Sequence, residues 1–255
     1  MHVMEIRVAL LPVLAGDVQD AVCIVIDALR ATSAIAVLFA RNCPRVYVAA
    51  GHEAAIRFAR ENRLLLCGET GGRKPEGFDF GNSPVEFLTQ DFQGRPVVLS
   101  TTNGTYALSQ VRQARHVFAG APLNRTAVAQ AAWTAAQQAE ADIVIVCSGT
   151  DGDFTLEDAT SAGLFVEALI AQATPWELPL LDDAAVACKR LWQQDPQLLR
   201  SWLEGRHAQH LAEIGFGEDV AYCAQLDRLS VVPELVRDSD SSAELPTAPI
   251  FLVPA

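Results

Sequence analysis

The sequence is most informative about its fold in residues 22–33, which read Val-Cys-Ile-Val-Ile-Asp-Ala-Leu-Arg-Ala-Thr-Ser. The five apolar residues at 22–26 predict a buried strand. A polar turn with Asp27 and Arg30 follows, and then a helical period from about residue 32. In open α/β sheets, this order places the turn at the carboxyl end of a strand, where ligands bind.

The same order recurs along the chain and predicts an α/β fold with a mixed, largely parallel sheet and flanking helices. Apolar runs predict strands at 22–26, 46–49, 64–67, 97–100, 116–119 and 143–147, with weaker ones at 6–11, 230–236 and 250–253. Helical periods lie at about 32–41, 52–61, 84–90, 104–112, 125–140, 156–173, 182–194 and 207–225. The rhythm restarts near residue 120, so we expect either two α/β lobes, 1–120 and 121–255, or one compact unit. The polar segment 237–249 predicts a surface loop.

Composition and charge exclude several classes of protein. Half of the 255 residues are apolar and 20% are charged, which is typical of a globular protein. No apolar run approaches the roughly 20 residues of a membrane helix, and the N-terminus lacks a signal-peptide pattern, so we expect a cytoplasmic protein without a membrane partner. Six scattered cysteines without a C-x-x-C pair predict buried free thiols. The sequence does not fix the oligomeric state, for which we assume a homodimer.

The formal net charge of −12 also constrains the ligand. It repels nucleic acid at long range, so we expect no nucleic-acid partner. It repels a phosphorylated substrate in the same way. A site for such an anion must therefore supply local positive potential from a metal, arginines or backbone N–H groups.

Five strand-to-helix loops could form this site if they converge on one cleft. They lie at 26–33, 67–72, 100–105, 120–125 and 147–152. Known signatures do not explain them: Gly68 to Lys74 resembles a P-loop only superficially, since Pro75 replaces the Ser or Thr that would hold magnesium. A Cys147 nucleophile is disfavoured because Asp153 stands where an arginine would clamp phosphate.

Several side chains in these loops have the chemistry of an anion site. Asp27 with Arg30 pairs a carboxylate for a metal with a guanidinium for an anion. Glu69 is a second strand-end carboxylate, for which a simple surface charge is the alternative. Glu157 and Asp158 could bind a metal or only favour a helix N-terminus. His207 and His210, one helical turn apart, predict a half-exposed helix face rather than a metal site.

Residues 77–84, Gly-Phe-Asp-Phe-Gly-Asn-Ser-Pro, predict a tight turn that points N–H groups at an anion, with a purely structural turn as the alternative. Ser83 and Glu86 predict a capping box at the start of the next helix. Thr155 and Asp158 predict a second one, more weakly.

Taken together, these segments resemble the 2-phosphosulfolactate phosphatase family over most of the chain. The matching motifs are residues 27–33, 68–69, 77–84, 101–105, Asn124, 147–149, 156–158 and 162–163, with a looser match through Leu211, Gly215, Asp219, Cys223 and Val232-Pro233. The resemblance implies a magnesium-dependent phosphatase that converts (R)-2-phospho-3-sulfolactate to 3-sulfolactate and phosphate, a step of coenzyme M biosynthesis. In the family a basic residue often follows the Gly-Glu motif, but Thr70 stands there in this chain. Arg73 and Lys74 are candidates to compensate.

The resemblance also suggests roles for individual residues. Asp27 and Glu69 would hold the metal, with Glu157 or Asp158 assisting directly or through water, and Arg30 would hold the phosphoryl group. Side chains expected to bind the anionic substituents are Thr32, Asn82, Ser83, Thr101, Thr102, Asn103, Asn124, Arg125 and Ser148. An aspartyl-phosphate at Asp27 is the rival mechanism, although Leu29 replaces the second Asp of the usual Asp-x-Asp motif. The alternative functions are a phosphatase for another 2-phosphorylated carboxylate and a non-catalytic anion-binding protein.

Overall fold

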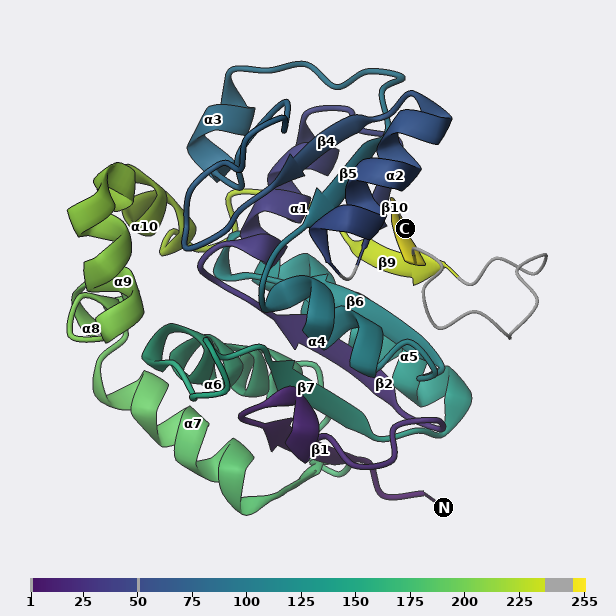
Figure 1. Ribbon diagram of the computed structural model, residues 1–255. Coiled ribbons are helices and arrows are strands. Elements are labelled where there is room, and N and C mark those ends of the chain that lie inside the picture. The colour runs from purple at the N-terminus through teal and green to yellow at the C-terminus, as the bar shows by residue number, and fades with distance from the viewer. Residues whose placement is uncertain (1, 50, 237–249) are drawn as a thin grey trace.

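The computed structural model describes residues 2–49, 51–236 and 250–255 (Figure 1). Its described strands form one ten-stranded sheet in the order β4-β5-β3-β10-β9-β6-β2-β7-β1-β8. Their bounds are β1 Glu5–Ala9, β2 Val22–Ile26, β3 Val46–Val48, β4 Leu65–Gly68, β5 Val97–Ser100, β6 His116–Gly120, β7 Ile143–Cys147, β8 Leu180–Leu181, β9 Pro233–Val236 and β10 Ile250–Pro254. The predicted α/β fold with a mixed, largely parallel sheet is confirmed.

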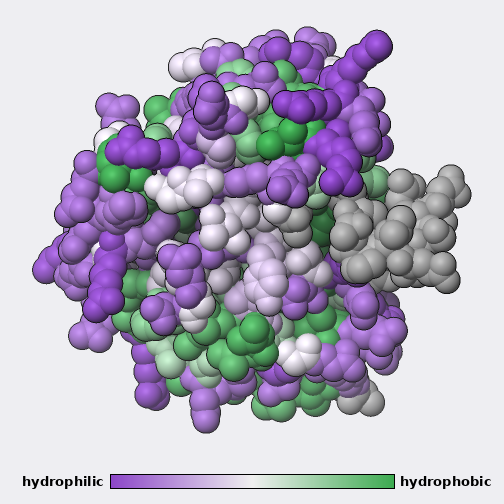
Figure 2. Space-filling view, in the orientation of Figure 1, coloured by the Kyte–Doolittle hydropathy of each residue, from purple (hydrophilic) through white to green (hydrophobic). Residues whose placement is uncertain are grey.

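Helices cover both faces of the central strands. Along β2, Val22, Ile24 and Ile26 pack into one apolar cluster with helices α5 (Arg125–Ala139) and α6 (Leu156–Ile170). Cys23 and Val25 pack into a second cluster with α1 (Ala31–Ala40) and α4 (Gly104–Gln110). Because both faces are covered, all five residues of β2 are buried, which is why the sequence there reads as a continuous apolar run. The face of the molecule in Figure 2 is largely hydrophilic, with separate hydrophobic patches.

The bounds of the helices are α1 Ala31–Ala40, α2 His52–Asn62, α3 Pro84–Leu88, α4 Gly104–Gln110, α5 Arg125–Ala139, α6 Leu156–Ile170, α7 Asp183–Gln194, α8 Leu198–Trp202, α9 Arg206–Leu211 and α10 Gly217–Cys223. The predicted helix 207–225 is wrong as one element. It is interrupted by a π-helical turn, η3 (Ala212–Phe216), in which Gly215 has a φ of 98°. A left-handed φ cannot continue a helix, so the chain changes direction there. Helix α8 and the two-residue strand β8 were not predicted from the sequence.

The two predicted capping boxes differ from the observed helix starts. Ser83 caps α3 by accepting from the Glu86 N–H, but the Glu86 carboxylate accepts from the N–H of Gly81 and not from that of Ser83. Thr155 precedes α6 without a side-chain capping bond, and its buried hydroxyl has no partner among the described residues. The predicted capping box at the N-terminus of α6 is therefore not formed.

The antiparallel strands β9 and β10 join two parallel groups of strands. Strand β10 pairs with β3, and β9 pairs with β6, so the C-terminal strands lie in the middle of the sheet. Strand β7 lies between β1 and β2, which come from the first 120 residues. The division into lobes at residue 120 stays a prediction, as do the homodimer, the cytoplasmic location and the absence of a nucleic-acid partner. The predicted surface loop 237–249 lies outside the described residues.

Two predictions about composition can be compared with the structure. All six cysteines are buried and free, which confirms the prediction of unpaired thiols. None of the helices described combines the length and the apolar character needed to cross a bilayer.

Candidate active site

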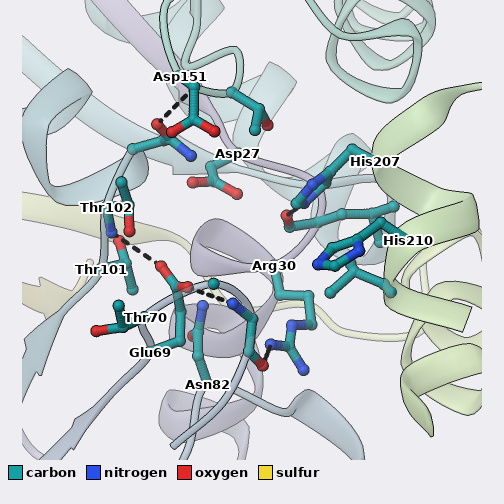
Figure 3. Close-up of a pocket in the computed structure, with 16 residues that line it drawn as sticks. Asp27, Arg30, Glu69, Thr70, Asn82, Thr101, Thr102, Asp151, His207 and His210 are labelled. Atoms are coloured by element: carbon teal, nitrogen blue, oxygen red, sulfur yellow. Dashed lines mark hydrogen bonds between the residues drawn. The ribbon is translucent and has the colours of Figure 1, made fainter. Parts of the chain in front are cut away.

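A cavity of about 290 Å³ lies where the carboxyl ends of parallel strands meet helix α9 (Figure 3). The loops after β2, β4, β5 and β7 contribute to its wall, as predicted for four of the five loops. Its lining comprises Asp27, Leu29, Arg30, Glu69, Thr70, Gly71, Gly72, Asn82, Thr101, Thr102, Asn103, Thr150, Asp151, His207, His210 and Leu211. The expected fifth loop, after β6, contributes no lining residue in the described part of the chain.

Asp27 follows β2 directly and has a carboxylate that is almost fully buried in the cavity wall. Its Oδ1 accepts from the N–H of Ala31 at 3.1 Å. Burial, and then the nearby carboxylate of Glu69, raise the pKa of Asp27 to about 6 against the opposing hydrogen bond from Ala31. A Cβ on Gly104 would lie 2.5 Å from Asp27 Oδ2, so only glycine allows α4 to approach this carboxylate.

Glu69 connects two of the loops that line the cavity. Its Oε2 accepts from the N–H of Gly72 at 2.8 Å, and its Oε1 accepts from the N–H of Thr102 at 2.9 Å (Figure 3). Each carboxylate oxygen has a further lone pair, so these bonds leave acceptor capacity for a cation. The structure thus brings Glu69 and Asp27 together in one cavity, as the sequence predicted.

Glu157 and Asp158 lie behind Asp27 and do not line the cavity. The carboxylate of Asp158 accepts from the N–H of Ala28 at 2.9 Å and from that of Gly149 at 3.0 Å, and so joins the loops after β2 and β7. Burial and then the charge of Asp27 raise the pKa of Glu157 to about 7. The same two causes raise the pKa of Asp158 well above its usual value. Oε2 of Glu157 is buried without a partner among the described residues.

Arg30 reaches the cavity at the first residue before α1, where the Leu29–Arg30 peptide bond is cis. Its guanidinium is already held by protein groups. Nη1 donates to Asp219 Oδ2 at 2.7 Å, and Nη2 donates to the carbonyl of Gly72 at 2.5 Å. The guanidinium carbon lies 4.2 Å from the centre of the Phe216 ring. The partner Asp219 was not among the predicted site residues.

Four further residues with predicted roles line the cavity. These are Asn82, Thr101, Thr102 and Asn103. Asn82 is 3% exposed, and its Oδ1 has no partner among the described residues. Asn103 Oδ1 accepts from the N–H of Asp151 at 3.3 Å and so joins the loops after β5 and β7.

The remaining predicted binding residues lie outside the cavity and support the structure around it. They are Thr32, Ser83, Asn124, Arg125 and Ser148. The Thr32 hydroxyl and the Asp27 backbone hydrogen bond to each other, which fixes the turn after β2. Asn124 is buried and accepts from the N–H of Ala121. These side chains hydrogen bond to the backbone, because the N–H and C=O groups of a buried loop need hydrogen-bond partners.

The other three side chains do not face the cavity either: Ser83 and Arg125 bind carboxylates of the protein, and Ser148 is buried. Ser83 Oγ donates to Asp219 Oδ1 at 2.7 Å. Arg125 binds Asp227, so the guanidinium expected to add positive potential is paired with a carboxylate outside the cavity. Ser148 Oγ is buried without a partner among the described residues.

The family model for 2-phosphosulpholactate phosphatase matches residues 11–238, which is most of the chain. This chain belongs to the 2-phosphosulfolactate phosphatase family. Similar relatives include proteins from Carboxydothermus hydrogenoformans, 38% identical over 91% of this chain and 93% of the relative, and Deinococcus radiodurans, 39% identical over 94% and 97%. Both are named "Probable 2-phosphosulfolactate phosphatase". The predicted phosphoric monoester hydrolase is confirmed, and the non-catalytic alternative is set aside.

In this member of the 2-phosphosulfolactate phosphatase family, several cavity residues were missed as site residues. They are Thr70, Asp151, His207 and His210. Nε2 of His207 lies 2.8 Å from the carbonyl oxygen of Leu29. Since a carbonyl only accepts, Nε2 carries the hydrogen, and burial lowers the pKa of this ring. The spacing of the two histidines by one helical turn was visible, but nothing local indicated which way that face points.

Cys147 has the environment of a structural thiol in this phosphatase. It is buried at the end of β7, and burial raises its pKa well above the usual value, followed by the charge of Asp158. A thiol in this state is not ionised near neutral pH and is a poor nucleophile. Its surroundings therefore agree with the prediction that Cys147 has no chemical role.

The donor set of the cavity fits a loosely held hard cation better than a closed protein site. The described residues contain no group of three or more His, Cys, Asp or Glu side chains arranged to bind a metal. Magnesium, however, often binds through one or two carboxylates together with waters and substrate phosphate. Asp27 and Glu69 meet that requirement, and their mutual repulsion, which raises the pKa of Asp27, is the kind of charge excess that a divalent cation relieves.

Proposed function

We propose that this protein hydrolyses the phosphate ester of (R)-2-phospho-3-sulfolactate to 3-sulfolactate and phosphate with the assistance of magnesium. The observation that carries the proposal is the shared cavity, which is lined by two carboxylates, Asp27 and Glu69, together with the guanidinium of Arg30. The names of the relatives support the substrate, and the chemistry of the cavity supports the reaction class.

Asp27 and Glu69 would hold the metal. Glu157 and Asp158 do not line the cavity, so they would influence the metal only indirectly, through their charge beside Asp27. Bound magnesium would stabilise negative charge on the phosphoryl oxygens and lower the pKa of a bound water. With magnesium bound, the two carboxylates would present less net negative charge to the substrate. Without it they would repel the substrate, so metal and substrate should bind cooperatively.

The chain's own donors would bind the substrate. A guanidinium has five N–H donors, and hydrogen bonds to Asp219 and Gly72 account for two of those on Arg30 among the described residues. The remaining donors of Arg30 and the side-chain amide of Asn82 are available to phosphoryl oxygens, which accumulate charge in the transition state. Thr101 and Thr102 would bind the other anionic substituents.

The attacking group is either water or the carboxylate of Asp27. The carboxylate of Asp27 accepts backbone hydrogen bonds from Ala31 and Gly104, which lower its nucleophilicity and support direct attack by water with Asp27 as a metal ligand. Rapid quenching of single-turnover reactions with phosphorus-labelled substrate separates the two routes, because only an aspartyl-phosphate leaves phosphoryl label on the protein. A trapped phosphoenzyme with the label on Asp27 would establish Asp27 as the nucleophile.

The central experiment measures phosphate release from phosphosulfolactate, phospholactate and phosphoglycolate in chelator and with magnesium added back. We expect strong preference for phosphosulfolactate, no activity in chelator and recovery with magnesium. Equal turnover of all three substrates would contradict the specific assignment. Full activity after prolonged dialysis against chelator would contradict the role of the metal.

Two conservative variants sharpen this experiment. Asp27→Asn and Glu69→Gln remove one negative charge each at nearly constant volume, so each should raise the magnesium concentration needed for half-maximal rate. Cys147→Ser is the matched control, because Cys147 lies close in the fold but outside the cavity. Its magnesium dependence should equal that of the parent protein.

A further inference from the structure

Asp219 is the buried carboxylate that holds the guanidinium of Arg30. Asp219 lies in α10, 189 residues from Arg30 in sequence, and each of the two side chains is 2% exposed. Its Oδ2 accepts from Arg30 Nη1, and its Oδ1 accepts from Ser83 Oγ at 2.7 Å and from the N–H of Val85 at 3.2 Å. Both oxygens are therefore used, and Asp219 does not line the cavity.

Two more contacts fix the plane of the same guanidinium. The carbonyl of Gly72 accepts from Nη2, and the ring of Phe216 stacks on one face. Phe216 ends the π-helical turn in which Gly215 takes a left-handed φ of 98°, so the irregular turn between α9 and α10 sets both stacking and ion pairing. Gly72 has a left-handed φ of 79°, which favours glycine, and it lies beside Ile214 of the same turn.

We propose that Asp219 is a positioning residue for the hydrolysis: it orients the Arg30 guanidinium so that its unused N–H donors face the phosphoryl group. This inference rests on the proposed function for its kinetic consequence. The planar guanidinium has a direction that a point charge lacks, and three partners from outside α1 fix that direction. The same ion pair attaches α10, and through it the wall formed by His207 and His210, to the loop that begins at Asp27.

A buried carboxylate next to a phosphate-binding arginine lowers the net positive charge available to the substrate. It would therefore weaken simple electrostatic binding of an anion while improving the geometry of the transition state. The carboxylate should therefore weaken the binding of phosphate in the ground state but raise kcat. Loss of the carboxylate should lower kcat without weakening the binding of phosphate, whereas a purely structural residue should change neither in the folded protein.

The test compares Asp219→Asn with the parent protein in phosphate release and in inhibition by inorganic phosphate. The substitution keeps the size and an acceptor for Ser83 but removes the charge that holds Arg30. We expect kcat to fall by about tenfold or more, with the inhibition constant for inorganic phosphate unchanged or lower. Phe216→Leu, which removes only the stacking face, should lower kcat in the same direction and serves if Asp219→Asn does not fold.

The matched control is Asp227→Asn. Asp227 also accepts from an arginine, Arg125, and from a backbone N–H, that of Thr126, but this ion pair lies outside the cavity. Its kcat should equal that of the parent. A folded Asp219→Asn protein with parental kcat would overturn the inference, and so would an equal loss of kcat in Asp227→Asn.

A readout independent of turnover separates this inference from the proposed function. In protein labelled with [¹⁵N]arginine, the Nε–H signal of Arg30 is identified by its absence from Arg30→Lys. We expect that signal to shift and broaden in Asp219→Asn and to stay unchanged in Asp227→Asn. An unchanged signal in Asp219→Asn overturns the positioning role, whereas the absence of phosphate release by the parent protein counts against the proposed function alone.

Discussion

At the residue scale, Arg30 differs from a lysine because its charge is spread over a planar guanidinium with several donors. Its planar fork reaches Asp219, Gly72 and the Phe216 ring at once, which an ammonium group cannot do. Arg30→Lys should therefore lower kcat by about 10²-fold, and it should also lower the unfolding temperature, because buried contacts of the guanidinium are lost. Steady-state kinetics of Arg115→Lys provide the control, because Arg115 is an exposed arginine that forms an ion pair with Asp20 and does not line the cavity. Parental kcat in Arg30→Lys would remove Arg30 from the transition state.

Asp27 makes a prediction about stability and pH. Its folded pKa of about 6 lies above the value of about 3.9 expected in the unfolded chain, so the folded state binds more protons between these values. The carboxyl group therefore costs increasing stability as pH rises through this window, on the order of 1–3 kcal/mol when fully ionised. Asp27→Asn removes that cost.

In chelator, the unfolding temperature of Asp27→Asn should rise relative to the parent between pH 4 and pH 7. Added magnesium should shrink the difference by stabilising the parent. A difference that does not depend on pH would contradict the raised pKa of Asp27.

At the element scale, the packing of α6 against α7 depends on one small residue. A Cβ on Gly163 in α6 would lie 2.0 Å from the carbonyl oxygen of Cys188 in α7, so the two backbones are in contact. Gly163→Ala must push the helices apart and should cost about 1–3 kcal/mol through overpacking.

Denaturant unfolding of Gly163→Ala measures this cost. Gly217→Ala is the control, because a Cβ there would meet nothing closer than 3.8 Å and the residue begins the helix α10. The control should match or exceed the stability of the parent, since alanine favours a helix. Equal stability of the two variants would show that α6 and α7 can separate freely.

At the scale of the whole molecule, a net charge of −12 acts on a substrate that carries several negative charges. Repulsion at long range is screened when the Debye length falls from about 30 Å at 0.01 M to about 8 Å at 0.15 M ionic strength. At saturating magnesium, kcat/KM should therefore rise over this range of salt concentration. A steady fall would show that the local field of Arg30 dominates over the field of the whole protein.

Local patterns were sufficient to predict most elements of the fold. Runs such as 22–26 and 143–147 are apolar throughout because both faces of their strands are covered, and this pattern can be read without any tertiary information. Strand β8 was missed because two residues, Leu180 and Leu181, do not form a recognisable pattern. The predicted helix 207–225 was wrong because its apolar spacing continues through Gly215, where the backbone turns.

For the site, the sequence by itself determined that Asp27, Arg30, Glu69 and the segment 101–103 follow strand ends and that Asn82 belongs to a tight turn, and these residues share one cavity. Only the tertiary structure decided which polar groups face that cavity and which satisfy the buried backbone, as Asn124 does. It alone also brought Asp219 to Arg30 and the histidines of α9 to the opposite wall. The physical reason is that strand ends are specified by local hydrophobic periodicity, whereas ion pairs between distant segments depend on sheet order and on the turn at Gly215.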